Sequence, residues 1–322
     1  FLEYIVAATN HQYMLFFTEK GKCFWLRVFE IPEGSKISKG RAVQNLINIE
    51  PDDKIKAYIR TNDLKDQEYI NKMNVVMITK NGTIKKTSLE AYSRPRTNGV
   101  NAIEIRDNDQ LLGARLTDGN SEIMIATKAG KCIRFPEEKA RAVGRGSIGV
   151  RGITLSEGDE VIGMIVVNDV QNETVLVVSE RGYGKRTAVE DYRITNRGGK
   201  GVITLNITEK TGNLIAIQMV TDDDGLMIIN KSGVAIRMGM DEMRVMGRNT
   251  QGVKVINLKK NDEIAAIAKV EMDKEVIIEE GEIIEGAEDQ EEGTPVIEAG
   301  SDTDNEIIQP EENKDSEDES EE

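Results

Sequence analysis

Short apolar runs alternate with polar turns along most of the chain, and this pattern predicts β-strands. Val75–Thr79 is a β-branched run, Lys80-Asn81-Gly82 is a turn, and Thr83–Thr87 runs back. The Asn-Gly pair favours the positive φ angles of a tight hairpin, so we predict two paired strands here. Alternation continues over Gly99–Ile105 and Leu111–Leu116, which predicts two further strands.

The same unit recurs five times, each with a hairpin glycine and a second glycine that closes a basic loop. The hairpin glycines are Gly21, Gly82, Gly130, Gly182 and Gly233, and the closing glycines are Gly40, Gly99, Gly149, Gly201 and Gly252. Successive hairpin glycines lie 61, 48, 52 and 51 residues apart. A strand-built repeat of this length predicts blades that bury their faces against their neighbours.

We therefore predict an all-β domain over residues 1–270, made of five four-stranded blades. The units span about 1–61, 70–117, 121–168, 173–221 and 224–270. The extra length between the first two units falls around Asn62–Asn74, which we interpret as an exposed insertion. No part of this domain shows the 3.6-residue periodicity of a helix.

Charge is strongly segregated along the chain. Residues 271–322 hold 23 acidic residues and 2 lysines, a net charge of -21. Subtraction from the totals of 57 acidic and 42 basic residues leaves 34 and 40 in residues 1–270, a net charge of +6. The acidic tail is too polar to bury a core, so we predict that it is disordered.

Cysteine usage and apolar runs indicate a cytoplasmic setting without a membrane partner. Cys23 and Cys132 each follow a hairpin glycine by two residues, which predicts small buried strand residues rather than a disulfide. The longest apolar runs, such as Val161–Val167, have the length of strands and not of membrane spans. The chain opens within an apolar run, Phe1–Val6, without an initiator methionine, so we expect it to be part of a longer protein.

Catalytic, cofactor and metal sites are not indicated by the residues of the domain. His11 is the single histidine, and no phosphate-binding Gly-x-x-x-x-Gly-Lys-Ser/Thr loop or metal-ligand spacing occurs. Asp52-Asp53 and Asp222-Asp223-Asp224 are interpreted as solvated turns. We predict no catalytic, cofactor-binding or metal-binding residue.

Basic residues recur at fixed places before the closing glycines, and this repetition points to a function. Arg141, Arg193 and Arg244 lie eight residues before the closing glycine, and Arg145, Arg197 and Arg248 lie four residues before it. The predicted DNA-binding residues are Lys36, Lys39, Arg41, Arg94, Arg96, Arg141, Arg145, Lys185, Arg186, Arg193, Arg197, Lys200, Arg244 and Arg248.

One basic loop by itself indicates only a solvated surface. Equivalent loops of successive blades, however, would form a curved stripe along one rim. Such a stripe matches the phosphates of double-stranded DNA, and its lack of aromatic residues argues against a single-strand platform.

Residues 1–270 resemble the C-terminal domain of the DNA gyrase A protein. The most specific stretches are Gly182-Tyr183-Gly184-Lys185-Arg186-Thr187, Gly149-Val150-Arg151-Gly152-Ile153 and Gly247-Arg248-Asn249-Thr250-Gln251-Gly252-Val253. The resemblance implies a β-pinwheel, which is propeller-like but exchanges strands between blades. It also implies that duplex DNA wraps around the rim so that an ATP-dependent type II topoisomerase introduces negative supercoils.

The same resemblance implies partners and cofactors outside this chain. The partners would be the catalytic core of gyrase A together with gyrase B, in a heterotetramer. ATP and Mg would belong to that holoenzyme, and no cofactor is expected in this fragment. An acidic tail after the last blade also fits the family.

Two departures from the family pattern stand out. The box Gln-Arg-Arg-Gly-Gly-Lys-Gly belongs to a first blade that should precede Phe1, and its nearest match here is the loop Arg197, Gly198, Gly199, Lys200 and Gly201. The family's nucleophilic tyrosine follows an arginine, and none of the seven tyrosines here does. We therefore expect five of six blades and no cleavage chemistry.

Two alternatives stay open. The first is the equivalent domain of the topoisomerase IV A protein, although the regular spacing and the acidic tail favour gyrase. The second is a protein-binding propeller scaffold without a DNA role, which would carry exposed apolar or aromatic residues on its rim.

Overall fold

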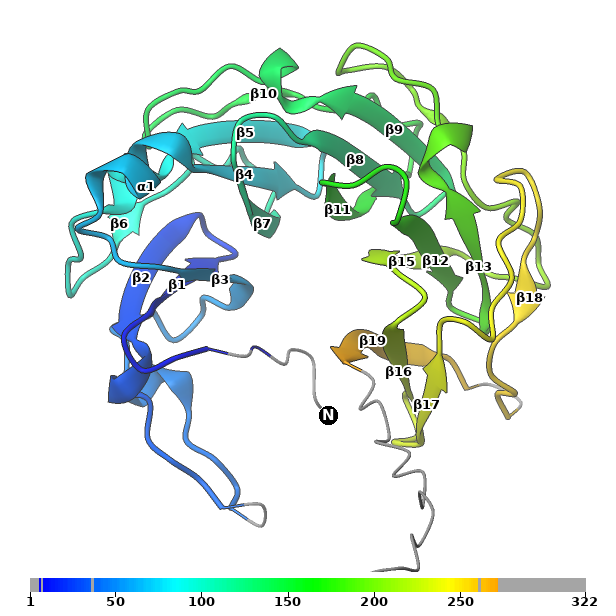
Figure 1. Ribbon diagram of the computed structural model, residues 1–322, viewed down its shortest axis with the longest axis horizontal. Helices are drawn as coiled ribbons and strands as arrows, with labels where there is room; N and C mark the ends of the chain where they lie inside the picture. The colour runs from blue at the N-terminus through cyan, green and yellow to red at the C-terminus, as the bar shows by residue number, and fades with distance from the viewer. Residues whose placement is uncertain (1–5, 7, 36–37, 260–261, 272–322) are drawn as a thin grey trace, which may run out of the picture. The chain divides into compact units, whose positions relative to one another are not determined.

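The computed structural model describes residues 6, 8–35, 38–259 and 262–271 (Figure 1). The chain divides into two units, Phe1–Lys274 and Glu275–Glu322, and every described residue belongs to the first. Apart from Glu271, the predicted acidic tail therefore lies outside the described residues.

The first unit is built of five antiparallel sheets, which we call blades 1 to 5. Blade 1 has the order β3 (Ile55–Thr61), β1 (Tyr13–Thr18), β2 (Lys22–Arg27), β6 (Val100–Asn101). Blade 2 has the order β10 (Val150–Arg151), β5 (Thr83–Ser88), β4 (Asn74–Thr79), β7 (Leu111–Thr117). Blade 3 has the order β11 (Val161–Val167), β8 (Glu122–Thr127), β9 (Lys131–Pro136), β14 (Val202–Ile203).

Blade 4 has the order β15 (Leu214–Val220), β12 (Thr174–Ser179), β13 (Tyr183–Ala188), β18 (Val253–Lys254). Blade 5 has three strands among the described residues, in the order β17 (Ala235–Gly239), β16 (Asp224–Asn230), β19 (Ile264–Glu271). Short 3-10 turns follow the hairpins or lie in the loops: η1 (Val28–Glu30), η2 (Val43–Asn45), η3 (Leu89–Tyr92), η4 (Glu137–Lys139) and η5 (Val189–Asp191).

Strands are exchanged between consecutive blades. The outermost strand β6 follows the closing glycine of the second unit but pairs with β2 of the first, with Lys22 opposite Asn101 and Cys23 opposite Val100. The strands β10, β14 and β18 join the preceding blades in the same way. This confirms the all-β, propeller-like fold and the exchange implied by the resemblance, whereas the continuous strand predicted over Gly99–Ile105 is reduced to two residues.

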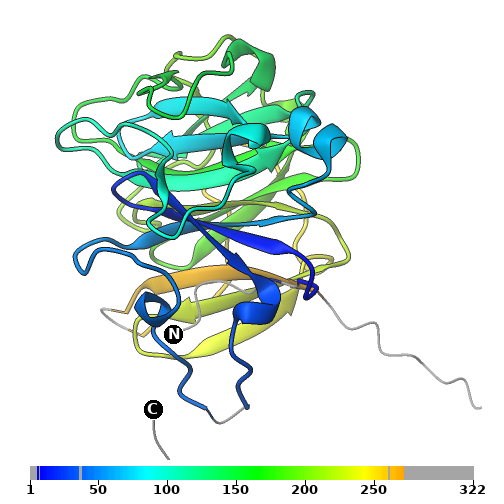
Figure 2. The ribbon, with the colours of Figure 1, turned by 90° about the vertical axis from the view of Figure 1, so that its left-hand side faces the viewer.

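The blades pack face to face, so their central strands are buried on both sides. In β12, Val175 and Val177 join the core shared with blade 3, whereas Leu176 and Val178 join the core shared with blade 5. Viewed from the side, the sheets follow one another as layers (Figure 2). Cys23 and Cys132 are free and buried in these cores, as predicted.

The closing glycines of units 2 to 5 allow the exchanged strands to approach the preceding blades closely. Gly201 has a φ of +74°, and a Cβ on it would lie 2.7 Å from the carbonyl oxygen of Cys132. The neighbouring strand of the preceding blade therefore approaches too closely for any side chain, in a conformation that L-residues rarely adopt.

The prediction of an exposed insertion at Asn62–Asn74 is wrong in part. This segment contains the helix α1 (Gln67–Lys72), capped by the Asp66 side chain, which accepts a hydrogen bond from the Tyr69 backbone N–H. Leu64 and Ile70 are buried in the core between blades 1 and 2. A six-residue helix is too short to produce a convincing periodicity, which is why the sequence pattern missed it.

Candidate nucleic-acid interface

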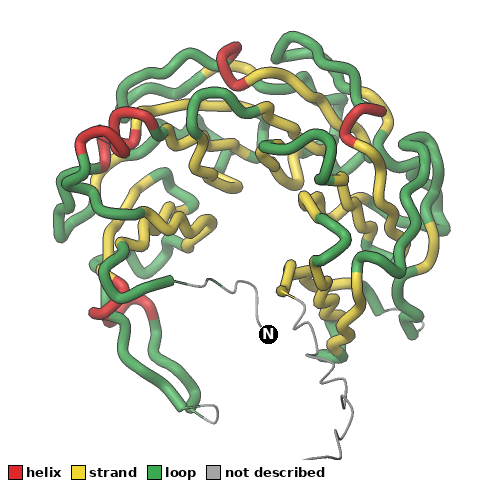
Figure 3. The backbone as a smooth tube through the Cα atoms, viewed as in Figure 1, coloured by secondary structure: helices red, strands yellow, loops and turns green. Residues whose placement is uncertain are grey.

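The basic loops lie on the outer perimeter of the domain. The loops of units 2 to 5 lead into β6, β10, β14 and β18, which are the outermost strands, whereas β3, β7, β11, β15 and β19 lie innermost (Figures 1 and 3). The loop of the first unit leads to η2 instead. Eight of the predicted residues are exposed there, and we call them the perimeter cations: Lys39, Arg41, Arg94, Arg96, Arg141, Arg193, Lys200 and Arg244. Arg145, Arg197 and Arg248 are half-buried, and Lys36 lies outside the described residues.

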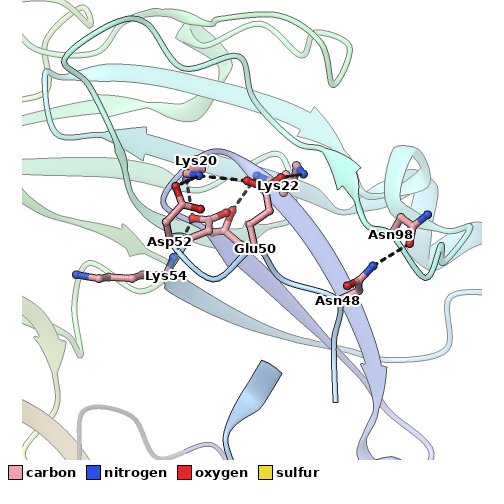
Figure 4. Close-up of polar contacts among 9 residues, drawn as sticks. Lys20, Lys22, Asn48, Glu50, Asp52, Lys54 and Asn98 are labelled. Carbon is pink, nitrogen blue, oxygen red and sulfur yellow. Dashed lines mark hydrogen bonds and ion pairs between the residues drawn. The ribbon is translucent and has the colours of Figure 1, made fainter. Parts of the chain in front are cut away.

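Among the described residues, the perimeter cations lack the acidic partners that several basic residues elsewhere in the domain have. None of the eight forms an ion pair with another described residue. In the turn of the first hairpin, by contrast, Lys20 Nζ lies 2.6 Å from Asp52 Oδ2, and Lys22 Nζ lies 2.6 Å from Glu50 Oε1 (Figure 4). The perimeter loops therefore carry positive charge that no described acidic residue pairs with, and a polyanion could approach it there.

Arg197 and Arg248 combine partial exposure with a structural contact. Arg197 donates from Nε to the carbonyl of Lys139 at 2.8 Å and from Nη1 to the carbonyl of Arg151 at 3.0 Å. Arg248 repeats the pattern one blade later, at 3.1 Å to Asp191 and 3.0 Å to Ile203. Each guanidinium thus ties its loop to the preceding unit and retains only part of its donors for a ligand.

The prediction that Lys185 and Arg186 contact DNA is wrong. Lys185 is 0% and Arg186 is 3% exposed, because both lie within β13 between two packed blades. Arg186 donates from Nη1 to the carbonyls of Met240 at 2.6 Å and Met243 at 3.3 Å.

Arg186 belongs to a repeated set of buried donors, four residues after each hairpin glycine. Trp25, Lys86 and Arg134 occupy this position in blades 1 to 3 and donate to Tyr92, Glu137 and Val189. Of these four residues, Lys86 lies in a strand that the alternation predicted, Thr83–Thr87.

The carboxylates interpreted as solvated turns are also partly structural. Asp53 is 4% exposed and accepts a hydrogen bond from the Lys20 backbone N–H at 3.1 Å. Asp224 is 8% exposed and lies 2.8 Å from Lys269 Nζ. Asp222 is paired with Arg186 at 2.5 Å. Solvation therefore does not explain Asp53 and Asp224, whereas the Asp222 side chain is 78% exposed and agrees with the prediction apart from this contact.

The sequence-based selection missed two exposed basic residues on the outermost strands themselves, Arg151 in β10 and Lys254 in β18. Both follow a closing glycine by two residues, a spacing that could have identified them. Exposed aliphatic residues also occur on the perimeter, with Ile194 at 55% and Val245 at 49%. Each directly follows a perimeter arginine, so the apolar residues are interleaved with positive charge.

The innermost strands enclose a central cavity of about 950 Å³. Aliphatic residues such as Ile78, Ile162 and Ile217 line it together with the polar side chains of Lys54, Lys56, Arg115 and Lys269. Across the described part of the chain, no three His, Cys, Asp or Glu side chains gather into a potential metal site. No helix of that part is both long and apolar enough to cross a membrane.

Strand exchange, face-to-face blades and a perimeter of unpaired cations define a β-pinwheel of the type found in type IIA topoisomerases. The chain belongs to the family described as DNA gyrase C-terminal domain, beta-propeller, whose profile matches residues 12–62, 74–118, 121–168, 173–221 and 226–271.

Two curated relatives agree with this assignment. The DNA gyrase A protein of Staphylococcus aureus strain NCTC 8325 / PS 47 is 43% identical over 275 residues, which is 85% of this chain and 31% of the relative. The corresponding protein of strain MRSA252 is 43% identical over 273 residues, which is 85% of this chain and 30% of the relative. The chain thus spans about a third of the length of these curated relatives.

Two solved structures share the fold. The C-terminal domain of DNA topoisomerase IV aligns with a TM-score of 0.73 and 25% identity, covering 81% of this chain and 80% of that one. The DNA gyrase A C-terminal domain aligns with a TM-score of 0.69 and 23% identity, covering 83% and 89%.

Proposed function

We propose that residues 1–270 bind duplex DNA along the perimeter and bend it around successive blades. The observation that carries this proposal is the recurrence of exposed arginines without an acidic partner at equivalent places in consecutive loops. Repetition supplies contacts at intervals along a curved path, which suits a phosphate backbone better than a compact ligand. The loops offer few aromatic residues on which single-stranded bases could stack.

In the intact protein, this domain would serve a type II DNA topoisomerase as the wrapping region of gyrase A. Its partners would be double-stranded DNA, the catalytic core of the same polypeptide and gyrase B. ATP and Mg would act at those other parts of a cytoplasmic heterotetramer. The names of the relatives support gyrase in particular.

A salt titration on duplex DNA tests the proposal. If about six to ten phosphates are neutralised, log K should fall against log salt with a slope of about -5 to -9. Competition with unrelated duplexes should show little sequence preference, because phosphate contacts carry no base information. A slope near zero would contradict the proposal and favour a protein-binding scaffold.

A domain of the topoisomerase IV type is the second candidate, supported by the structural similarity to that domain. The two candidates differ in wrapping rather than in binding. Relaxation of a circular duplex in the presence of this domain would trap a change in linking number if DNA is wrapped. Binding without any such change would favour the topoisomerase IV type.

A further inference from the structure

Two of the five blades bury a lysine at a position that is apolar in the other three. Lys85 and Lys185 lie three residues after their hairpin glycines and are 1% and 0% exposed. The equivalent residues of blades 1, 3 and 5 are Phe24, Ile133 and Ile236. An ammonium is costly to bury, so its presence here needs a specific set of partners.

The partners of Lys185 are oxygens of the arginine loop in the fifth unit. Its Nζ donates to the carbonyls of Gly247 at 2.9 Å and Thr250 at 3.1 Å, and to the Thr250 hydroxyl at 3.2 Å. It also donates to the carbonyl of Arg248. Lys185 forms no ion pair with a described residue, so its charge is compensated mainly by backbone dipoles of one loop.

Lys85 of blade 2 makes the corresponding contact with the loop of the third unit. Its Nζ donates to the carbonyl of Arg145 and, at 2.7 Å, to the carbonyl of Ala102. A cavity of about 280 Å³ lies under this loop, and Lys85, Glu104 and Arg141 are among its lining residues. Lys85 therefore makes fewer hydrogen bonds to the loop of the third unit than Lys185 makes to the loop of the fifth.

We propose that Lys85 and Lys185 are positioning residues, which hold the arginine loops of the following units in the geometry that receives DNA phosphates. This inference rests on the proposed function. Each lysine bonds the carbonyl of a half-buried arginine, Arg145 or Arg248, and each loop also carries a perimeter arginine, Arg141 or Arg244. Replacement of the lysine would leave buried carbonyls without a donor, and deprotonation would remove the charge and one of three N–H donors, so in either case the loop would move or admit water.

The lowered pKa of these two lysines predicts a pH dependence of DNA affinity that can test the proposal. Burial lowers the pKa of both to about 8, and the positive charges of Arg145 and Arg248 act in the same direction. The charged groups that face them from neighbouring elements are Glu104 for Lys85 and Asp191 for Lys185. Neither carboxylates nor arginines ordinarily change charge between about pH 7 and 9.5, and burial raises the pKa of nearby Tyr92 and Cys23.

The experiment measures DNA affinity and loop protection for Lys185→Met, alone and with Lys85→Met. Ile133→Met is the matched control, because it alters the same position in a blade whose loop contacts no ammonium. Lys200→Met is the second control, because it removes an exposed charge and leaves the buried one. Duplex affinity is measured at about pH 7 and 9.5 in 0.1 M salt, together with amide hydrogen exchange of residues 244–252.

One phosphate contact contributes about eightfold to the affinity at 0.1 M salt. If each displaced loop loses at least one such contact, the affinity of the wild-type domain for duplex DNA should fall by about that factor or more between about pH 7 and 9.5. The double variant should bind weakly at both pH values, and Lys185→Met should lose exchange protection in residues 247–252. Lys200→Met should bind more weakly while keeping the wild-type pH dependence.

Wild-type affinity and loop protection in Lys185→Met would overturn the proposal. If Lys185→Met fails to fold, a pH-independent affinity of the wild-type domain would overturn it equally. If the wild-type domain does not bind duplex DNA at all, the proposed function fails, while hydrogen exchange still tests the loop contact separately.

Discussion

Arg186 donates from Nη1 to the backbone carbonyl of Met240 across 2.6 Å, and this contact joins the fourth blade to the fifth. The donor is a strand residue and the acceptor lies directly after the next hairpin, 54 residues later. Arg134 makes the equivalent contacts to Val189 at 2.8 Å and Tyr192 at 3.0 Å. Each junction between blades thus carries a buried donor that the apolar faces alone would not provide.

Replacement of Arg186 should therefore weaken the domain itself. Arg186→Met should lower the free energy of unfolding by about 1–3 kcal/mol, because the carbonyls of Met240 and Met243 lose their donor inside the core. Urea unfolding followed by circular dichroism measures this change. The exposed Arg193→Met should stay within about 0.5 kcal/mol of the wild type. An equal effect of the two substitutions would contradict the assignment of Arg186 to the junction.

The three arginines that lie eight residues before a closing glycine should contribute to DNA binding and not to the stability of the fold. Successive replacement of Arg141, Arg193 and Arg244 by Ala should reduce the magnitude of the salt slope by about 0.9 for each phosphate that is no longer neutralised. All three are exposed and unpaired among the described residues, so the unfolding midpoint should hardly change. A slope unchanged in the triple variant would exclude these residues from the interface.

Arg197 and Lys200 should matter most for DNA binding, because they lie in the loop that most resembles the family box. Lys200→Ala should reduce affinity without altering stability, since Lys200 is exposed. Arg197→Ala should reduce both, since it also removes the hydrogen bonds to Lys139 and Arg151. Filter binding and urea unfolding separate the two effects. Undiminished bending of DNA by the double variant in ring-closure assays would refute this hierarchy.

The buried lysines should make stability rise with pH. Their folded-state pKa of about 8 lies below the ordinary value of 10.5, so over this interval the unfolded chain binds more protons than the folded one. Relative to the Lys85→Met/Lys185→Met variant, the wild-type free energy of unfolding should increase from about pH 8 to 10.5. The increase is on the order of 3 kcal/mol per lysine at most.

Urea unfolding at a series of pH values measures this difference. Below about pH 8 both states carry the charge, and the difference should be flat. The free energy of unfolding should rise with pH, whereas DNA affinity should fall. These opposite trends separate the effect of the lysines on stability from their role in positioning the loops. A difference that falls as the pH rises would show that the folded state favours the charged form.

The acidic tail should compete with DNA for the perimeter. It lies outside the described residues except for Glu271, so this prediction rests on its sequence charge of -21 beside +6. Removal of residues 271–322 should tighten duplex binding at low salt, because a tethered polyanion acts at high effective concentration. The gain should shrink as the Debye length falls from about 30 Å at 0.01 M to about 10 Å at 0.1 M salt.

A neutral tail of equal length, with its acidic residues replaced by Gln or Asn, should reproduce the truncation. Equal affinities of the full and truncated chains at low salt would instead assign the tail a solubilising role.

The sequence determined the number of blades, their hairpins and the loops that carry the perimeter cations. These features depend on local chemistry: glycine where φ is positive, alternation along a strand, and arginine at a fixed distance from a closing glycine. Gly82 has the positive φ that its hairpin turn predicted, at +85°, whereas Asn81 beside it does not. The burial of Cys23 and Cys132 followed from the same alternation.

Only the tertiary structure decided which cations face solvent. Lys185 and Lys200 are equally basic in sequence, but a strand between two packed faces buries the first, and a loop on the perimeter exposes the second. Sequence periodicity could not predict the strand exchange either, because Val100 and Asn101 pair with a strand of the preceding unit and no local pattern encodes that pairing. Burial and strand pairing depend on which residues of the neighbouring blade pack against a strand, and this is decided only in the assembled fold.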